Sequence, residues 1–346
     1  MIQRHGGDIY RNQVNMDFSV NTNPLGIPQS VRDAMQGAIT HVGEYPDPEN
    51  ALLTEALASH LLIPKEWLCF GNGASELFMA IVHALKPKKI LLPVPSFYGY
   101  EHAAEAAGCE IVAFLLRAEN DFALQDDFYS FLTEETDLIF LANPNNPTGR
   151  KIDKAYGMKL LKRCLDKNIT VVMDECFIEF VGEEHSFMEQ LQNFDNLIIV
   201  RAFTKIYAIP GVRLGYLLCA NQQMRKQICV QLPEWNLSVF AQKAGQACLS
   251  SENEAYLTET VRYVKKERQF LTEELQQMGI RIFQGEANFL LFYCEENLYE
   301  KLLRRGILIR DCSNFEGLSQ GYYRIAVKRH EENLQLLEAI KECLKP

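Results

Sequence analysis

Short apolar runs alternate with amphipathic stretches from about residue 70 onward. Residues 74–85 carry Leu77, Ile81 and Leu85 at the spacing of a helical stripe, and the Lys-Pro pair that follows ends the predicted helix. Residues 89–93 predict a short strand, because Ile90, Leu91 and Leu92 form an apolar run. Because several such runs lack polar alternation, they predict strands that helices cover on both faces of a sheet.

The alternation continues through the middle of the chain. Helices are predicted over residues 98–107 and 154–167. Strands are predicted over residues 110–115, 137–142, 169–174, 197–201 and 214–219. Strands separated by helices in this order predict an α/β fold with a doubly wound, mostly parallel sheet.

The pattern changes near residue 250, where a long charged helix is predicted over residues 253–278. Short strands follow, and a last helix is predicted over residues 330–344; the strands are expected at residues 281–283, 289–293, 307–310 and 322–326. This order predicts a smaller α+β domain. We therefore divide the chain into an N-terminal arm (1–40), a large domain (41–250) and a small C-terminal domain (251–346). The arm lacks periodicity and is either a plain extension or a cover over a site.

Composition and charge exclude several classes of protein. Of the 346 residues 47% are hydrophobic and 23% charged, which is typical of a globular protein. The net charge of −10 argues against general binding of nucleic acid or anionic membrane, so an anionic ligand needs locally placed cations. No apolar run approaches the roughly 18 residues that cross a bilayer, and the start lacks the apolar stretch of a signal peptide. These features predict a cytoplasmic protein.

Several common motifs are missing. The ten cysteines include no Cys-x-x-Cys pair, which predicts reduced thiols and no metal site. Gly71-x-Gly73 is followed by Glu76, where a dinucleotide fingerprint has its third glycine. The chain contains no Walker A motif, no Gly-x-Ser-x-Gly and no His-Glu-x-x-His, so the common ATPase, hydrolase and metalloprotease templates do not apply.

Polar residues follow three successive predicted strands instead. The run Asn-Pro-Asn-Asn-Pro-Thr-Gly at residues 143–149 ends one strand, and Asp174 ends the next. Lys205 follows the third strand, within the run Arg-Ala-Phe-Thr-Lys-Ile-Tyr-Ala-Ile-Pro-Gly-Val-Arg-Leu-Gly-Tyr at residues 201–216. Because ligands collect outside the carboxyl ends of such strands, we expect these residues to converge on one crevice.

Together these motifs resemble those of the fold-type I pyridoxal-phosphate enzymes, in the aminotransferase superfamily, over nearly the whole chain. The resemblance implies that pyridoxal 5′-phosphate is the cofactor and that Lys205 is the Schiff-base lysine and proton carrier at Cα. It implies that Asp174 keeps the pyridine nitrogen protonated and that Asn146 donates to the ring oxygen O3′. A surface lysine, a capping aspartate and a simple turn are the alternatives for these three positions.

The resemblance also assigns the residues that bind the cofactor phosphate. Gly73, Ala74 and Ser75 stand at a predicted helix start, where backbone N–H groups and the helix dipole favour an anion. Arg213, eight residues after Lys205, pairs with the phosphate in the family, and Thr204 is a further candidate.

Three aromatic residues have implied roles at the cofactor. Phe97 matches the residue that stacks on the pyridine ring, with a core phenylalanine as the alternative. Tyr45 resembles the tyrosine that reaches the cofactor phosphate from a partner subunit, which implies a homodimer. Phe177 departs from the family, in which a tyrosine often donates to O3′; we expect the loss of this donor to raise the pKa of the Schiff base.

Two arginines and the N-terminal arm resemble a substrate site. Arg324 matches the arginine that binds the amino-acid carboxylate, and Arg310 is placed to add a second cation. His5, within the His5-Gly6-Gly7 opening, and Asn23 are further candidates for a distal phosphate. Ordinary surface arginines and a simple terminal segment are the alternatives.

Within the superfamily, two subfamilies share this framework. The His-Gly-Gly opening, the Asn-x-Asn-Pro-Leu-Gly run at residues 21–26 and the segment 307–318 resemble L-threonine O-3-phosphate decarboxylase of cobalamin biosynthesis. That enzyme class forms (R)-1-amino-2-propanol O-2-phosphate. Histidinol-phosphate aminotransferase with a 2-oxo acid acceptor is the alternative. A non-catalytic regulatory protein of this fold usually carries a DNA-binding extension, for which the chain has neither room nor a basic patch.

Overall fold

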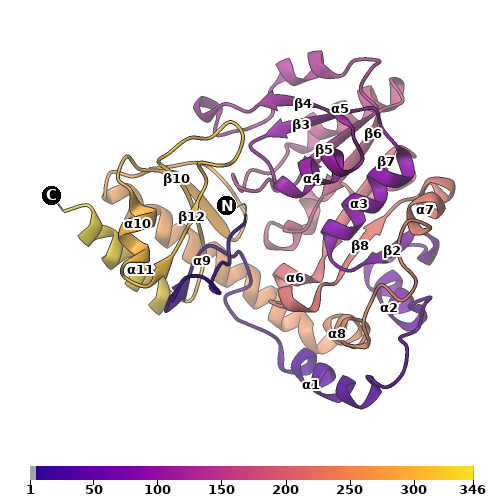
Figure 1. The fold of residues 1–346 in the computed structure, drawn as a ribbon, viewed down its shortest axis with the longest axis horizontal. Helices are drawn as coiled ribbons and strands as arrows, with labels where there is room; N and C mark the ends of the chain where they lie inside the picture. Colours follow the sequence, from indigo (N-terminus) through magenta and orange to yellow (C-terminus); the bar gives the residue numbers. More distant parts are fainter. Residues whose placement is uncertain (1–4, 346) are drawn as a thin grey trace.

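A computed structural model describes residues 5–345, so residues 1–4 of the predicted arm and Pro346 lie outside the described residues. The large domain is built on a seven-stranded sheet with the order β2-β8-β7-β6-β5-β3-β4 (Figure 1). Its strands are β2 (Leu68–Gly71), β3 (Lys89–Val94), β4 (Glu110–Leu115), β5 (Leu138–Ala142), β6 (Thr170–Asp174), β7 (Leu197–Ala202) and β8 (Gly215–Leu218).

The predicted α/β fold with a mostly parallel sheet is confirmed. Only β8 runs against its neighbours, β2 and β7, whereas the other adjacent pairs in this sheet are parallel. In register, Ala142 pairs with Asp174, and Asp174 pairs with Val200. The carboxyl ends of β5, β6 and β7 therefore lie side by side, at the edge where the polar motifs follow.

Helices cover both faces of this sheet, which explains the continuous apolar runs of its strands. The helices α3 (Ala74–Leu85), α4 (Tyr98–Ala106) and α7 (Gln222–Cys229) share one core with alternate strand residues such as Val172. The helices α5 (Lys154–Asp166) and α8 (Val239–Cys248) pack on the other face, with Val171 and Met173. Successive side chains of β6 thus enter two different cores.

The small domain contains a four-stranded antiparallel sheet and three helices. Its strands, in spatial order, are β12 (Arg310–Asp311), β13 (Tyr322–Ala326), β10 (Phe289–Tyr293) and β9 (Arg281–Ile282). Its helices are α9 (Glu254–Gln277), α10 (Leu298–Leu303) and α11 (His330–Cys343). Arg310 pairs in register with Arg324, so adjacent strands bring the two arginines together.

The N-terminal arm belongs to both domains. Its strand β1 (Met16–Asp17) pairs in parallel with β11 (Ile307–Leu308), and Phe18 is fully buried in the core of the small domain. The chain then crosses to α1 (Gln29–Ala38), which packs on α8, and continues to α2 (Ala51–Leu61) (Figure 1). The single strand predicted over 307–310 was wrong, because the chain changes partners at Ile309 and continues as β12 beside β13.

Two further features, a membrane-spanning helix and a metal-binding cluster, were sought among the described residues. Within residues 5–345, no helix is long and apolar enough to cross a membrane. The same residues contain no group of three or more His, Cys, Asp or Glu side chains that could hold a metal ion.

Candidate active site

A pocket of about 220 Å³ lies at the edge where β5, β6 and β7 end. The arm, the start of α3, the start of α4 and the small-domain strands complete its wall. The predicted site residues that line it are His5, Gly6, Ala74, Ser75, Phe97, Asn146, Asp174, Phe177, Thr204, Lys205, Arg213, Arg310 and Arg324. Gly73, Asn23 and Tyr45 are the predicted site residues outside this lining.

Lys205 stands in the short helix α6 (Phe203–Ile206), directly after β7. Burial lowers the pKa of its ammonium group to about 8, and the charges of Arg324 and Arg213 act in the same direction. Its Nζ lies 5.9 Å from the centre of the Phe177 ring. An amine with this pKa is partly neutral near pH 7, as a nucleophilic lysine requires.

Asp174 faces the same pocket from the end of β6. Its Oδ2 accepts a hydrogen bond of 2.5 Å from the hydroxyl of Tyr100, and its Oδ1 accepts one of 2.9 Å from the backbone N–H of Cys176. Burial raises the pKa of Asp174, whereas these hydrogen bonds and the charge of Lys205 lower it. Partners of this kind favour the ionised carboxylate, which can hold a cationic N–H.

Tyr100 is a site residue that the sequence analysis missed. It lines the pocket, stacks on Phe140 with 4.9 Å between ring centres, and its pKa is raised well above the ordinary value, chiefly by burial. Its hydroxyl therefore stays protonated and donates to Asp174. The available signal was its spacing of three residues from Phe97, which places both side chains on neighbouring positions at the start of α4.

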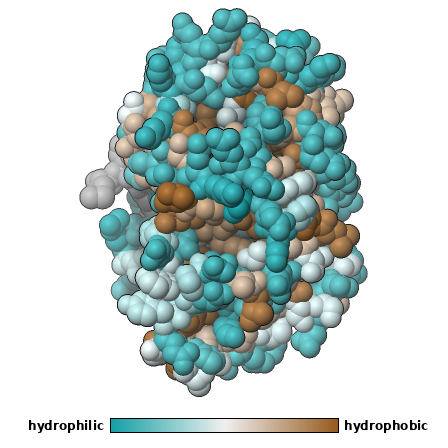
Figure 2. All heavy atoms as spheres, turned by 90° about the vertical axis from the view of Figure 1, so that its right-hand side faces the viewer, coloured by the Kyte–Doolittle hydropathy of each residue, from teal (hydrophilic) through white to brown (hydrophobic). Residues whose placement is uncertain are grey.

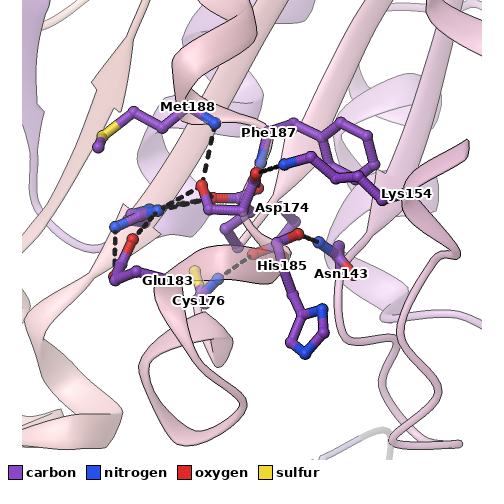
Figure 3. A network of polar contacts seen from close by, with 11 residues as sticks. Asn143, Lys154, Asp174, Cys176, Glu183, His185, Phe187 and Met188 are labelled. Carbon is purple, nitrogen blue, oxygen red and sulfur yellow. Dashed lines mark hydrogen bonds and ion pairs between the residues drawn. The ribbon is translucent and has the colours of Figure 1, made fainter. Parts of the chain in front are cut away.

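A buried ion pair between Glu175 and Arg201 links the ends of β6 and β7, and Figure 3 shows the polar network to which it belongs, with Glu183, Phe187 and Met188 labelled. Glu175 follows Asp174, and its Oε2 accepts hydrogen bonds of 3.1 and 2.9 Å from the guanidinium of Arg201 on β7. Ser186 and the backbone N–H of Phe187 also donate to Glu175. Because Arg201 lies in β7, four residues before Lys205, the pair fixes the strand that carries Asp174 to the strand that leads to Lys205.

The start of α3 and Arg213 form an anion-binding corner. Gly73 is the N-cap of α3 with φ of 84°, and a side chain there would overlap the guanidinium of Arg213. Only glycine therefore allows the arginine to lie against the helix start. The N–H groups of the first turn, which includes Ala74 and Ser75, and the cation of Arg213 suit a phosphate group.

Arg324 and Arg310 form a cationic wall on the small-domain side of the pocket. Arg324 is 6% exposed and Arg310 is 5% exposed. Burial lowers the pKa of Arg324 to about 10 and also lowers the pKa of Arg310, yet both remain charged at neutral pH. Arg324 donates to Asn146 Oδ1 and, at 2.7 Å, to the carbonyl of Ser19. The Oδ1 end of Asn146 is thus occupied, and its Nδ2 end carries donors for another group.

The first described residues of the arm, His5 and Gly6, line the pocket beside the start of α4. The ring centre of His5 lies 6.0 Å from that of Phe97 and 5.9 Å from that of Tyr98. Gly6 packs so closely on Ser19 that a side chain at this position would overlap its backbone. This close approach turns the arm back over the pocket.

Asn23 lies outside the pocket, in contrast to its predicted role as a phosphate ligand. Its Nδ2 lies 2.7 Å from each of three oxygens, those of the Ile206 carbonyl and of the Tyr256 and Thr260 hydroxyls. Its Oδ1 accepts the N–H of Leu25. The backbone N–H of Asn23 donates to the carbonyl of Lys205 at 3.0 Å, and its side-chain amide joins the arm to α6 and α9.

Tyr45 also lies outside this pocket. Its side chain is 81% exposed, and its ring centre lies 4.9 Å from that of Trp235. A role at the pocket of its own chain is therefore excluded by its position, and the predicted contact with a partner subunit stays a prediction.

Comparison with known proteins identifies the family. The family described as aminotransferase class I and II matches residues 13–340. The chain belongs to this family. Enzymes of this family depend on pyridoxal phosphate, which is the cofactor of this enzyme.

Individual relatives in the family fall into two groups. The chain is 36% identical to threonine-phosphate decarboxylase of Salmonella typhimurium, over 95% of this chain and 91% of that one. The structure of histidinol-phosphate aminotransferase from Clostridium acetobutylicum has a TM-score of 0.89 at 35% identity, over 94% of this chain and 98% of that one. The structure of L-threonine-O-3-phosphate decarboxylase from Porphyromonas gingivalis has a TM-score of 0.84 at 25% identity, over 95% of this chain and 99% of that one.

Proposed function

We propose that this enzyme decarboxylates L-threonine O-3-phosphate to (R)-1-amino-2-propanol O-2-phosphate. The observation that carries the proposal is the pair of buried arginines, Arg310 and Arg324, on one wall of the pocket that holds Lys205. The substrate has two anionic groups, a carboxylate and a phosphate, and a chain with a net charge of −10 must pair both locally. The 36% identity to a threonine-phosphate decarboxylase supports the same substrate.

The residues at the strand ends suit pyridoxal phosphate. When bound, this cofactor supplies an electron sink for the bond that breaks at the substrate Cα. Lys205 would hold the cofactor through Nζ and would carry the proton at the substrate Cα, while Asp174 would hold the proton on the ring nitrogen. Asn146 donates from Nδ2 to the ring oxygen O3′, and Phe97 covers one ring face. Phe177 has no hydroxyl, so it leaves O3′ with one donor fewer than a tyrosine would.

The anion-binding corner holds the cofactor phosphate in this proposal. The N–H groups of the first turn of α3, after Gly73, donate to it together with the hydroxyl of Ser75. Arg213 would neutralise its charge, and Thr204 would add a donor.

At the other end of the pocket, Arg324 binds the substrate carboxylate through its planar guanidinium. Arg310 pairs with the substrate phosphate, and His5 and Gly6 cover that phosphate from the arm. This placement puts the two anionic groups at separate cations. Reaction outcome then depends on which bond at Cα stands perpendicular to the ring.

A homodimer completes the site. On the side of the molecule that carries α2 and α7, apolar side chains gather around a depression bordered by hydrophilic ones (Figure 2). Tyr45 is 81% exposed and Trp235 is 44% exposed, and their ring centres lie 4.9 Å apart, so they add exposed aromatic surface. A partner on this surface would receive Tyr45 at its cofactor phosphate, as the family pattern implies.

Histidinol-phosphate aminotransferase is the second candidate, because a solved structure of that name has a TM-score of 0.89 to this chain. Its phosphorylated amine would use the same Arg310, and its 2-oxo acid acceptor would use Arg324. Unlike the decarboxylase, it needs that acceptor for every turnover.

The deciding experiment mixes the purified holoenzyme with L-threonine O-3-phosphate without any 2-oxo acid and follows carbon dioxide over many turnovers. We expect sustained release, and no release from the matched Lys205→Ala variant. Turnover of histidinol phosphate that depends on a 2-oxo acid, without carbon dioxide release from threonine phosphate, would establish the aminotransferase instead. If the protein gains no cofactor absorbance when mixed with pyridoxal phosphate, both the decarboxylase and the aminotransferase assignments are overturned.

A second experiment tests the arm. We expect His5→Ala to raise KM for the phosphorylated substrate, while the cofactor absorbance stays unchanged. Unchanged kinetics would remove His5 from the substrate site.

A further inference from the structure

Ser19 joins the beginning of the arm to the cationic wall of the pocket. It lies in the pocket lining, two residues after the end of β1, and it is only 1% exposed. Its hydroxyl accepts a hydrogen bond of 2.7 Å from the backbone N–H of Gly7. Its carbonyl accepts one of 2.7 Å from Nη2 of Arg324. One buried residue therefore contacts both the arm and an arginine of the pocket.

The hydroxyl of Ser19 is oriented by Asp17. Ser19 Oγ donates at 2.6 Å to Oδ1 of Asp17, and the same carboxylate oxygen accepts the backbone N–H of Ser19 at 2.8 Å. Because the single hydroxyl hydrogen points to Asp17, the lone pairs of Oγ are left for the N–H of Gly7. Asp17 is held in place in turn, since β1 pairs with β11 of the small domain. The small domain thus reaches Gly7 through two side chains.

Residues 5–7 form the arm tip, and the first two of them line the pocket. In the next part of the arm, the side chain of Asn12 donates to the carbonyl of Asp8, so this hydrogen bond stays within the arm. The bond from Gly7 to Ser19 instead bridges 12 positions and joins the arm tip to the pocket wall. The hydroxyl of Ser19 therefore sets where the arm tip lies.

We propose that Ser19 is a positioning residue that determines specificity for the phosphate of the substrate. This inference rests on the proposed function, in which the arm tip covers the phosphate and Arg324 binds the carboxylate. The hydroxyl of Ser19 places the arm tip, whereas its carbonyl orients Arg324. Removing the hydroxyl alone frees the arm tip and leaves the bond to Arg324 in place. Recognition of the phosphate then weakens, while recognition of the carboxylate is kept.

The first experiment measures the arm tip itself, by hydrogen exchange and mass spectrometry of the holoenzyme without substrate. We expect the amide of Gly7 to exchange about tenfold faster in Ser19→Ala, because its N–H loses its acceptor. The matched control Ser30→Ala removes a hydroxyl that donates to Asn253 at 3.1 Å, and it should leave exchange at Gly7 unchanged. Equal exchange at Gly7 in Ser19→Ala and in the unchanged enzyme would overturn the proposal.

The second experiment separates the two ends of the substrate. We expect Ser19→Ala to raise KM for L-threonine O-3-phosphate about tenfold, with kcat changed less than about twofold. L-Threonine has the carboxylate but no phosphate, so its affinity, followed by cofactor absorbance, should be the same for both enzymes. Equal weakening of the two ligands would contradict the proposal, because Ser19 would then act on the pocket as a whole.

Two further measures keep the test decisive. Circular dichroism and cofactor absorbance check the fold, and Ser19→Cys replaces Ser19→Ala if the latter does not fold, because a thiol of similar shape is only a weak acceptor. Exchange at Gly7 in the free holoenzyme involves no substrate, so it tests Ser19 even if the decarboxylase proposal fails. In that case the KM comparison is made with histidinol phosphate, where an unchanged KM would count against Ser19.

Discussion

Asp174 is buried and Lys205 is partly buried, and burial shifts their pKa values in opposite directions, each towards the uncharged form. Their partners differ in effect. Tyr100 and Cys176 donate to Asp174 and lower its pKa against the effect of burial, whereas the cations of Arg213 and Arg324 lower the pKa of Lys205 further. A single pocket thus contains a nucleophilic amine beside a carboxylate.

Uptake of the cofactor by the cofactor-free protein should depend on pH through Lys205. Its folded-state pKa is lowered to about 8, so the neutral amine is gained as pH rises through this value. We expect the uptake rate to rise about fivefold between pH 7 and pH 8 and to level off above pH 9. Stopped-flow absorbance of the bound cofactor measures this rate. A rate that still increases up to pH 10.5 would indicate an ordinary lysine.

Tyr100→Phe should weaken the cofactor site while leaving the stacking on Phe140 in place. The variant loses the 2.5 Å hydrogen bond to Asp174, so the pKa of this carboxyl rises further and its hold on the ring nitrogen weakens. A hydrogen bond to a charged group contributes about 1.5–3 kcal/mol, so we expect the dissociation constant of the cofactor to rise at least tenfold. Equilibrium dialysis measures it; an unchanged constant and an unchanged kcat would argue against this role.

Among the elements, β6 and β7 depend on the ion pair of Glu175 and Arg201. Both side chains are almost fully buried, and Glu183, the second partner of Arg201, is 53% exposed. The pair therefore stabilises the strand ends where the polar motifs begin.

Removing this pair should cost stability. We expect Glu175→Gln to lower the free energy of unfolding by about 3–5 kcal/mol, because the Arg201 charge loses its buried partner. The control Glu184→Gln, whose side chain is 72% exposed, should stay within about 0.5 kcal/mol. Urea unfolding followed by circular dichroism compares the two. Equal free energies of unfolding for the two variants would show that the buried Glu175–Arg201 pair does not stabilise the fold.

Helices and strands that a local sequence pattern marks could be predicted from the sequence, whereas contacts between distant segments could not. The strands β4, β10 and β13 and the helix α3 match their predicted ranges, because continuous apolar runs and a helical stripe mark them locally. The pairing of β1 with β11 joins residues that lie about 290 positions apart, and no local pattern reports it. The amide of Asn23 and the hydroxyl of Tyr100 were missed for the same reason, since their partners lie on distant elements.

For the molecule as a whole, the predicted homodimer has a test of its own. Tyr45→Ala and Lys205→Ala should each be inactive alone, because each lacks one residue of every site. Mixing the two after partial unfolding and refolding should restore about a quarter of the activity, since half of the dimers are mixed and each has one intact site. Sedimentation confirms the dimers. A mixture that stays inactive would place Tyr45 outside the site.

The arm gives the molecule an asymmetry between its two ends. His5 and Gly6 line the pocket, whereas α11 ends at the far side of the small domain (Figure 1). Only four residues separate an affinity tag fused ahead of Met1 from His5 in the pocket lining, so we expect such a tag to compete with small molecules for entry. Purification handles and fluorescent fusions therefore belong behind α11, and kinetic constants from amino-terminally tagged material should be compared with those of cleaved protein.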